Sequence, residues 1–423
     1  MTRGNFWFER AAGRSRTYPA ASSTMETDAV VVGGGIAGLS AARRLREHGL
    51  DVVLLEAKTC GAGATGHSSG FMTPDSELSL HTLVHRFGGD RASTLWQAAQ
   101  GACDGIRADT VAWNAPCDVV DADSIWVART ARQAKALHRE HAARGELGFE
   151  SRLHDASTIR GVLGSSAFVA GIRVPGTFGF DAFAYAAALR DMLADGGLRC
   201  FESSPVVEVG ANSVRTERAE VRARLVVLCL DRYAPDLGIA TRDAHHVQAF
   251  LTVTESVPES VWASIFPSGP LLVWDSDLVY HYVRGIGGGR MLVGGGRLLD
   301  TFSKQRQHSR SFGDLEHYAR TCFPVLGATR FTHSWSGLLG LSKDLLPIAG
   351  PRPGFPSHHL AVCGAGLPWS ALAGRCAADL ATGRDNELAA VFSPARRFNG
   401  LGAWQGLLGK SLTWAISYHL ARR

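Results

Sequence analysis

The sequence predicts an α/β protein with two domains, one built on a parallel sheet and the other on an antiparallel sheet. A β-branched run, a glycine-rich turn and an amphipathic helix follow one another early in the chain. Apolar runs that end near glycines, a pattern typical of antiparallel strands, occupy the middle of the chain. The length of 423 residues is more than one simple core contains, which also favours two domains.

The first elements form a βαβ unit. Thr27–Val32 ("TDAVVV") is a β-branched run of the kind found in buried parallel strands. Ile36–His48 has apolar residues at helical spacing, and Gly49 ends it. Asp51–Leu55 ("DVVLL") is a second strand, and Glu56 follows it directly. Strand, helix and strand in this order predict a parallel pair of strands.

Helices and strands continue along the rest of the chain. The expected helices are Ala131–Gly145 and Ala182–Gly196. The expected strands are Arg224–Leu230, Phe250–Thr254 and Leu271–Val283, and a hairpin turn is predicted at Gly285–Arg290 ("GIGGGR"). Near the end, another strand, glycine turn and helix are predicted within His359–Gly383.

The charge pattern and the cysteines narrow the functional classes. The formal net charge of +5 is small for this length, and the Lys and Arg residues are scattered, which argues against nucleic-acid binding. The eight cysteines form no CxxC pair, and their wide spacing indicates buried thiols in a reducing compartment such as the cytoplasm, with no metal site. No run of 18 apolar residues is free of polar breaks, so we expect no spanning helix.

A glycine pattern between the first strand and the first helix predicts a dinucleotide site. Gly33, Gly35 and Gly38 form G-x-G-x-x-G. The first glycine permits a tight turn, the second lets a pyrophosphate approach, and the third lets the helix pack on the strand. The phosphates then lie at a helix N-terminus, where free N–H groups favour negative charge. Glu56 is placed to accept the hydroxyls of a ribose.

Both NAD and FAD fit this unit, and two further segments favour FAD. The first is Gly63–Pro74 ("GATGHSSGFMTP"), a run of small residues that we interpret as a loop returning over the cofactor toward a ring system. The second is the glycine turn Gly364–Gly366, which opens a helix. A second helix N-terminus aimed at the same cofactor suits a reduced flavin, because its N1–C2=O edge carries negative charge.

Six segments follow one another in the order "VVVGGGIAGLSAARRL", "VVLLEA", "GATGHSSGF", "LVVLCLDRYAP", "SWSGLLGLSKDLLPIAG" and "AVCGAGLPWSALAG". From Phe6 to Gly383, this order resembles the D-amino acid oxidase/glycine oxidase (DAO-type) FAD-dependent oxidoreductases. The N-terminal "FWFERAAG" and the "TGH" loop look most similar to bacterial γ-glutamylputrescine oxidase-like members. The resemblance implies FAD and an amine or amino acid substrate. It also implies a p-hydroxybenzoate-hydroxylase-like fold, with a Rossmann-type FAD-binding domain and an antiparallel-sheet substrate domain.

The resemblance also assigns residues to the cofactor. The residues that match the adenosine diphosphate site are Gly33, Gly35, Gly38, Glu56 and Lys58. Val207 matches the position whose backbone contacts the adenine. The loop along the pyrophosphate and ring is matched by Ala64, Thr65, His67, Ser68 and Ser69. The pyrimidine edge of the flavin is matched by Gly364, Gly366, Leu367, Pro368 and Trp369. Here "GLPWS" departs from the small residues frequent in the family, so Pro368 and Trp369 are expected to alter the substrate pocket.

His67 has two interpretations. In dimethylglycine and sarcosine dehydrogenases, a loop of the form T-x-H-small-small-Gly carries the flavin covalently on its histidine, and Thr65–Gly70 has this spacing. The alternative is a histidine that hydrogen-bonds a phosphate or fills the loop, beside a flavin that is bound non-covalently. We favour the non-covalent interpretation.

The substrate sheet is expected to supply the groups that orient a substrate carbon for oxidation. In "LVYHYVRG", strand periodicity places Tyr280, Tyr282 and Arg284 on one face. Arg284 is predicted to hold a substrate carboxylate through two hydrogen bonds, with Tyr282 beside it. Weaker candidates, each near a predicted strand entry toward the flavin, are His246 and Trp335. An ordinary strand with a surface arginine and packed tyrosines is the alternative.

These assignments divide the chain. The FAD-binding domain is expected to comprise 27–90, 182–240 and 335–385, and the substrate domain 91–181 and 241–334, after an N-terminal leader at 1–26. The segment 386–423 is predicted as an amphipathic tail that either docks on the body of the protein or contacts a membrane surface. Its apolar residues at helical spacing are Leu401, Trp404, Leu408, Leu412 and Ala415.

The sequence therefore predicts an FAD-dependent oxidoreductase that takes a hydride from the C–N carbon of a small amine or amino acid, with oxygen or a quinone as electron acceptor. Two alternatives stay open, because fold alone does not choose among them. One is oxidation of a hydroxy acid or glycerol 3-phosphate on the same architecture. The other is a flavoprotein-like partner subunit without turnover.

Overall fold

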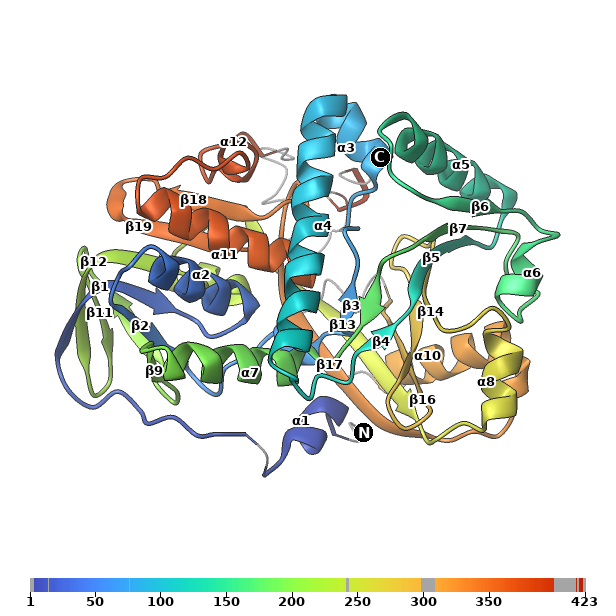
Figure 1. The fold of residues 1–423 in the computed structure, drawn as a ribbon, viewed down its shortest axis with the longest axis horizontal. Helices are drawn as coiled ribbons and strands as arrows, with labels where there is room; N and C mark the ends of the chain where they lie inside the picture. The colour runs from blue at the N-terminus through green and yellow to red at the C-terminus, as the bar shows by residue number, and fades with distance from the viewer. Residues whose placement is uncertain are drawn as a thin grey trace.

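The computed structural model describes residues 4–13, 15–75, 77–240, 243–297, 309–398, 416 and 418–420. Two large sheets lie on either side of a long helix, α4 (Gly89–Ala112), which stands upright between them in Figure 1. One sheet is built on parallel strands and the other is mainly antiparallel, which confirms the predicted α/β class with an antiparallel second sheet.

The first sheet contains the predicted βαβ unit. β1 (Met25–Val32) pairs in parallel with β2 (Val52–Leu55), and the second half of β1 and all of β2 are buried on both faces, as is typical of parallel strands. The parallel order continues through β9 (Arg199–Phe201), β12 (Glu220–Leu228) and β19 (Phe355–Val362). Antiparallel strands extend this sheet: β10 (Val206–Val209), β11 (Ser213–Thr216) and β18 (Ile348–Arg352).

Two helices that each follow a glycine turn pack against each other on this sheet. α2 (Ile36–Glu47) and α11 (Leu367–Ala381) lie next to each other in Figure 1. Gly374 makes their close approach possible, because an added Cβ there would collide with the carbonyl oxygen of Ala37. α7 (Ala182–Asp195) belongs to the same hydrophobic core. The two glycine turns therefore open from one rigid helix pair.

The second large sheet has the strand order β17-β13-β16-β15-β14-β5-β7-β6. All of its pairs are antiparallel except β14 with β5. Its strands are β5 (Asp123–Ala128), β6 (Arg152–His154), β7 (Ala170–Val174), β13 (Ala244–Thr254), β14 (Leu271–Asp275), β15 (Tyr282–Ile286), β16 (Arg290–Gly295) and β17 (Phe331–Ser342). A small third sheet joins β3 (Phe71–Met72), β8 (Phe178–Gly179) and β4 (Val120–Asp121).

The remaining helices cover these sheets or connect them. The α-helices are α1 (Phe6–Ala11), α3 (Leu80–Phe87), α5 (Ala131–Glu146), α6 (Ile159–Val162), α8 (Glu259–Ile265), α10 (Ser309–Cys322) and α12 (Ala389–Phe392). The 3-10 helices are η1 (Thr65–His67), η2 (Asp231–Leu237) and η3 (Pro324–Leu326). α4 shares its core with α2 and α11, through buried residues such as Leu95 and Trp96.

Two predictions about the second sheet need correction. The expected strand Leu271–Val283 is two strands, β14 and β15, because the buried Asp275 carboxylate accepts the N–H groups of Asp277 and His281 (both 3.1 Å) and closes a loop between them. The expected boundary at 335 falls inside β17, which belongs to the antiparallel sheet. The hairpin turn between β15 and β16 is present, with positive φ at Gly288 and Gly289. The other domain limits stay predictions.

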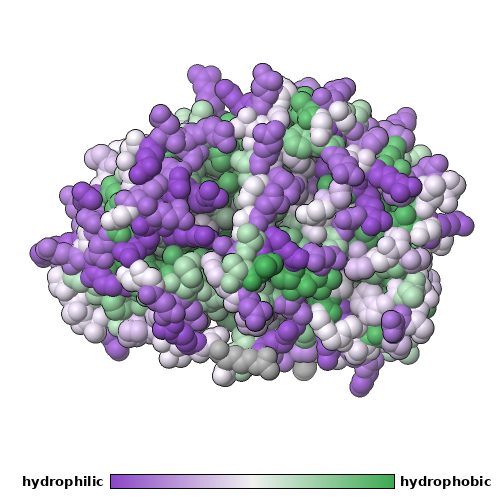
Figure 2. All heavy atoms as spheres, viewed as in Figure 1, coloured by the Kyte–Doolittle hydropathy of each residue, from purple (hydrophilic) through white to green (hydrophobic). Residues whose placement is uncertain are grey.

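Figure 2 shows a face that is largely hydrophilic, with hydrophobic side chains gathered near its centre. Among the helices of the described residues, none is long and apolar enough to cross a membrane. The apolar stripe predicted for the tail, from Leu401 to Ala415, lies outside the described residues, so its docking or membrane contact stays a prediction.

Candidate functional site

The first glycine turn has the geometry that its pattern predicts. Gly33 has a φ of +104°, and an added Cβ would collide with the Cys229 carbonyl oxygen. A Cβ at Gly38 would collide with the Gly33 carbonyl oxygen, so helix and strand approach closely only with glycine at both positions. Gly35 is the N-cap of α2 and supplies no side chain of its own. The N-terminal end of α2 lines a pocket, where Thr65 Oγ1 accepts the Ile36 N–H (3.1 Å).

Glu56 closes the βαβ unit at the carboxyl end of β2. Its two carboxylate oxygens accept the backbone N–H groups of Gly34 (2.7 Å) and Lys58 (2.8 Å), and burial raises the pKa of this carboxyl group. Each oxygen keeps a lone pair, which is what two ribose hydroxyls require. The Lys58 side chain is exposed, and Val207, on the outer strand β10, is 48% exposed. Their contacts with the cofactor stay predictions.

A single pocket extends from α2 to the second sheet. Its walls come from the loop after β2, from β13 and β17, and from the turn before α11. The residues that line these walls include Gly35, Ile36, Ala64, Thr65, His67, Ser68, Ser69, Val247, Gln248, Leu338, Leu339, Gly364, Gly366, Leu367 and Pro368. Residues expected at the pyrophosphate, ring and pyrimidine edge are thus brought together in one cavity.

The small residues of the loop from Ala64 to Gly70 lie between the pocket and the rest of the protein. Their pocket side faces the cavity, and their other side meets protein: an added Cβ at Gly66 would lie 2.6 Å from the Gly61 carbonyl oxygen and 2.7 Å from the Phe8 ring. His67 Nδ1 donates to the Gly63 carbonyl oxygen (2.8 Å), because a carbonyl only accepts. Burial lowers the pKa of His67, so Nε2 keeps a free lone pair in the neutral ring. His67 therefore lines the pocket as a neutral side chain.

The N-terminal segment, expected as a separate leader, supports this loop. Trp7 in α1 is buried, and its Nε1–H donates to the Ser68 carbonyl oxygen (3.0 Å). Asn5 caps α1 and donates from Nδ2 to the Gly66 carbonyl oxygen (3.0 Å). In Figure 1, α1 lies at the base of the molecule below both large sheets. The segment is part of the family resemblance, but no periodic pattern in the sequence predicts that it supports the loop at 65–69.

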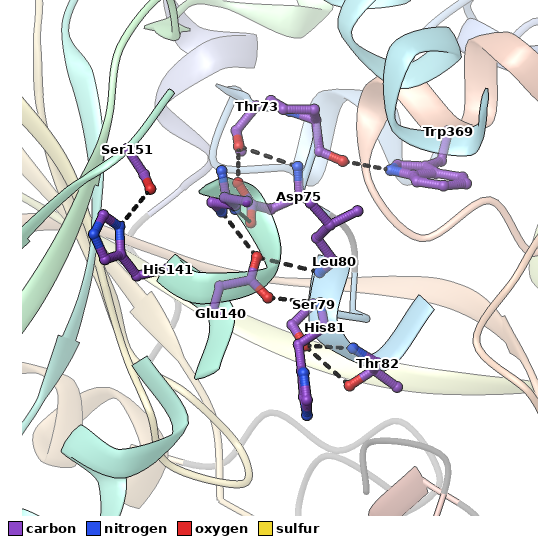
Figure 3. Close-up of polar contacts among 12 residues, drawn as sticks. Thr73, Asp75, Ser79, Leu80, His81, Thr82, Glu140, His141, Ser151 and Trp369 are labelled. Atoms are coloured by element: carbon purple, nitrogen blue, oxygen red, sulfur yellow. Dashed lines mark hydrogen bonds and ion pairs between the residues drawn. The ribbon is translucent and has the colours of Figure 1, made fainter. Parts of the chain in front are cut away.

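The second glycine turn differs from expectation at one residue. Gly366 has a φ of +93° and caps α11, and Leu367 and Pro368 line the pocket. Trp369 is turned away from it: the side chain is 1% exposed, and Nε1–H donates to the Pro74 carbonyl oxygen (3.0 Å), as Figure 3 shows. Trp369 is therefore part of the core and does not narrow the pocket.

Three of the residues predicted to contact substrate lie elsewhere. Arg284 faces the loop at 69–71, as the strand period predicts, but it is fully buried, and its guanidinium donates to the carbonyl oxygens of Ser69 (2.6 Å) and Phe180 (2.8 Å). Trp335 is buried and donates to the His67 carbonyl oxygen (3.3 Å). His246 stacks on His245 in β13. None of these three candidates lines the pocket, which argues against direct contact with substrate.

Tyr282 lines the pocket with Tyr280, as predicted from their shared face. Sequence reasoning missed other residues that line the pocket with them, which are Phe71, Asp75, Glu77, Trp274 and Tyr418. The two acids follow the small-residue loop in "TPDSEL", a signal that was available in the sequence. Nothing in the sequence placed Tyr418 there, because 341 residues separate it from its partner Glu77.

A group of two carboxylates and a histidine lies where β14 ends in the second sheet, although the sequence predicted no metal-ligand cluster. Asp275, Asp277 and His281 each offer a ligand atom, and these atoms lie within 4.8 Å of one another. Asp275 Oδ2 lies 3.3 Å from His281 Nδ1, and Gln133 donates to Asp277 (2.8 Å). These hydrogen bonds explain why the three residues lie together: they close the loop between β14 and β15.

A glycine turn between parallel strands, a carboxylate at the end of the second strand and a pocket that reaches an antiparallel sheet are the architecture of a dinucleotide-binding protein. Residues 28–380 match the family described as FAD dependent oxidoreductase (DAO), and the chain belongs to this family. The protein is therefore an FAD-dependent enzyme of the DAO family.

Individual relatives agree with this assignment. The chain is 25% identical over 388 residues to gamma-glutamylputrescine oxidoreductase of Escherichia coli, covering 89% of this chain and 88% of the relative. It is 24% identical over 384 residues to the probable oxidoreductase OrdL of Haemophilus influenzae, covering 88% and 86%. The crystal structure of glycine oxidase from Geobacillus kaustophilus superposes with a TM-score of 0.73 at 22% identity, covering 89% of this chain and all of that chain.

Proposed function

We propose that this enzyme oxidises a small amine or amino acid at the carbon attached to nitrogen. The observation that carries the proposal is the continuity of the pocket, which joins the dinucleotide unit to an aromatic end lined by Tyr280, Tyr282 and Trp274. The relatives named as a gamma-glutamylputrescine oxidoreductase and a glycine oxidase support this substrate class.

The residues present fit FAD. A Cβ at Gly33 or Gly38 would collide with protein backbone, so glycine keeps this turn tight at the start of α2, where a pyrophosphate would lie. Glu56 is placed to bind the ribose. The loop at 64–69 and the turn at Gly364–Pro368 line the continuation of the same cavity and would hold the flavin. When bound, the flavin supplies a two-electron acceptor for the hydride that leaves the substrate carbon.

The chain's own residues bind and orient the substrate. The rings of Phe71, Trp274 and Tyr282 form one wall, with centroids 6.3 Å apart for Phe71–Trp274 and 5.7 Å for Phe71–Tyr282. Such a wall excludes water and fixes the direction of a small carbon skeleton. The described part of the lining contains no Lys or Arg to balance an anionic group. This gives no support to oxidation of glycerol 3-phosphate or a hydroxy acid, and between the two proposed substrate classes it favours an amine over an amino acid.

Anaerobic reduction tests the proposal. The purified holoenzyme is mixed without oxygen with amines, D- and L-amino acids, N-methyl amino acids, hydroxy acids and glycerol 3-phosphate, and the flavin absorbance is followed. We expect bleaching by at least one amine-bearing compound. Bleaching by hydroxy acids or glycerol 3-phosphate alone would contradict the proposal, and no bleaching with FAD firmly bound would favour a partner subunit without turnover. Adding oxygen or a quinone to the bleached enzyme then identifies the acceptor.

A further inference from the structure

Glu77 places a carboxylate in the aromatic end of the pocket. Its Oε1 accepts the hydroxyl of Tyr280 (2.9 Å), and its Oε2 accepts the hydroxyl of Tyr418. All three residues line the pocket. Within the described residues, no Lys, Arg or His forms an ion pair with Glu77. Two neutral hydroxyls therefore hold a carboxylate whose charge no cation among the described residues balances.

The segment that carries Glu77 is fixed on both sides. Asp75 accepts the hydroxyl of Thr73 (2.6 Å) and pairs with Arg144 (2.7 Å). Glu140 accepts the N–H groups at the start of α3, from Leu80 (3.2 Å) and His81 (2.8 Å). Figure 3 shows Thr73, Asp75 and Glu140 joined in this network, with Trp369 bonded to the Pro74 carbonyl. Contacts at Asp75 and at the start of α3 thus hold the chain on either side of Glu77, and a binding group needs such support.

Asp75 does not share the role of Glu77, because Arg144 balances its charge. The Arg144 guanidinium bonds both Asp75 and Glu140 and is 1% exposed. Of the other titratable residues in the described lining, Asp231 accepts the Gly340 N–H (3.0 Å) and His67 is neutral. Among the described lining residues at the aromatic end, Glu77 is therefore the charged group that a ligand of opposite charge can bind.

Aromatic faces surround this carboxylate. Tyr280 and Tyr282 lie with ring centroids 6.0 Å apart, and Phe71 links Tyr282 to Trp274. Aromatic faces attract cations through the ring quadrupole, most strongly where water is excluded, and groups of such rings recognise ammonium ligands. A carboxylate beside such faces favours a positive charge and repels a negative one.

We propose that this end of the pocket binds a second positive charge on the substrate, so that the enzyme acts on aliphatic di- or polyamines. This inference rests on the proposed function and names its substrate class. The nitrogen that reacts must be neutral before its carbon loses a hydride, whereas a carboxylate and aromatic faces stabilise a charged ammonium. The ammonium beside Glu77 is thus a separate nitrogen from the reacting one. A free substrate carboxylate finds no counter-charge in the described lining.

A binding experiment without turnover tests the site. Butyltrimethylammonium, which cannot form an imine, is titrated into the oxidised holoenzyme beside the neutral 1-pentanol and the anionic valerate, and the flavin absorbance change gives each Kd. We expect the cation to bind at least tenfold more tightly than the alcohol, and valerate not to saturate. Glu77→Gln should weaken cation binding at least tenfold and leave the alcohol unchanged. The exposed Glu146→Gln is the matched control and should bind like the unmodified enzyme.

Trp274→Leu gives a second measurement in case Glu77→Gln fails to fold. It should weaken cation binding at least threefold with little effect on 1-pentanol. Equal binding of cation and valerate, or unchanged cation selectivity in Glu77→Gln, would overturn the inference. The same enzymes are then compared for bleaching by 1,4-diaminobutane and butylamine. Cation selectivity without bleaching by any amine would overturn the proposed oxidation, whereas bleaching by amino acids with full activity in Glu77→Gln would overturn the diamine assignment alone.

Discussion

Arg284 shows how strand periodicity and surroundings give different information about one residue. The alternation in "LVYHYVRG" correctly places Tyr282 and Arg284 toward the same loop. It does not show that Gly70 and Gly179 lie against the Arg284 guanidinium and leave the space that it fills. An added Cβ at Gly70 would lie only 2.8 Å from Arg284 Nη2. Burial lowers the pKa of Arg284 to about 10, and backbone carbonyls take its donors. That outcome depends on residues more than 100 positions away in the chain.

The substitution Arg284→Lys tests this structural role. One ammonium cannot reproduce the forked contact with the Ser69 and Phe180 carbonyl oxygens, which would lose donors while buried. We expect the free energy of unfolding to fall by roughly 2–4 kcal/mol, measured by denaturant unfolding. The exposed Arg215→Lys in β11 is the control. A KM that rises more than tenfold only for carboxylate-bearing substrates would instead show that Arg284 anchors substrate.

At His67, a single ring nitrogen determines whether the flavin is bound covalently or non-covalently. Its Nδ1 is committed to the Gly63 carbonyl, and its pKa is lowered, so only Nε2 is available for a covalent bond. We expect non-covalent binding, in which acid precipitation releases all of the flavin to the supernatant. His67→Ala should then still bind FAD, with an affinity reduced by no more than about tenfold. Yellow colour that stays with the precipitated protein and vanishes in His67→Ala would establish covalent attachment.

At the scale of elements, local patterns predicted the βαβ unit and both glycine turns, while elements held by distant contacts were harder to predict. β1, α2 and β2 start and end within two residues of their predicted limits, because propensity, glycine stops and burial agree there. The pattern of Leu271–Val283 predicts one strand, since the buried Asp275 that closes the intervening loop looks in sequence like any surface acid. The contact of α1 with the loop at 65–69 also has no local signature.

Helix α1 is expected to stabilise the cofactor loop. Trp7→Phe removes the N–H bond to the Ser68 carbonyl and keeps most of the buried ring area. The loss of one such bond is expected to weaken FAD retention by about 1 kcal/mol, or about fivefold in Kd, measured by flavin fluorescence on dilution. Trp262→Phe is the matched control, because its Nε1–H also donates to a backbone carbonyl, that of Gly289 in the second sheet. An equal loss of FAD in both variants would contradict a specific role for α1.

At the scale of the whole molecule, a cavity in the described part of the chain takes its walls from both large sheets. Gly35 and Pro368 line it from the parallel-sheet side, and Gln248 and Leu339 from the antiparallel strands β13 and β17. A sequence predicts each of these segments separately, but their convergence depends on contacts of β17 with His67 and with Asp231 in η2, which no local pattern encodes. The substrate end, where Tyr418 meets Glu77, could not be predicted for the same reason.

Because the cofactor site draws on both sheets, FAD binding should stabilise the entire fold. Apoprotein prepared by removing the flavin is heated with increasing FAD, and the midpoint temperature of unfolding is expected to rise continuously. At a hundredfold excess of FAD over Kd, the free energy of unfolding should be higher by about 2.7 kcal/mol. FMN, which lacks the adenosine monophosphate half, should give a much smaller rise, since it has no second phosphate for the turn at Gly33–Gly38 and no adenosine ribose for Glu56. Glu56→Ala should reduce the FAD effect by about 1.5–3 kcal/mol, because ribose hydroxyls lose a charged acceptor, and should leave the FMN effect unchanged. Equal stabilisation by FAD and FMN in the unmodified protein would contradict the role given to the βαβ unit.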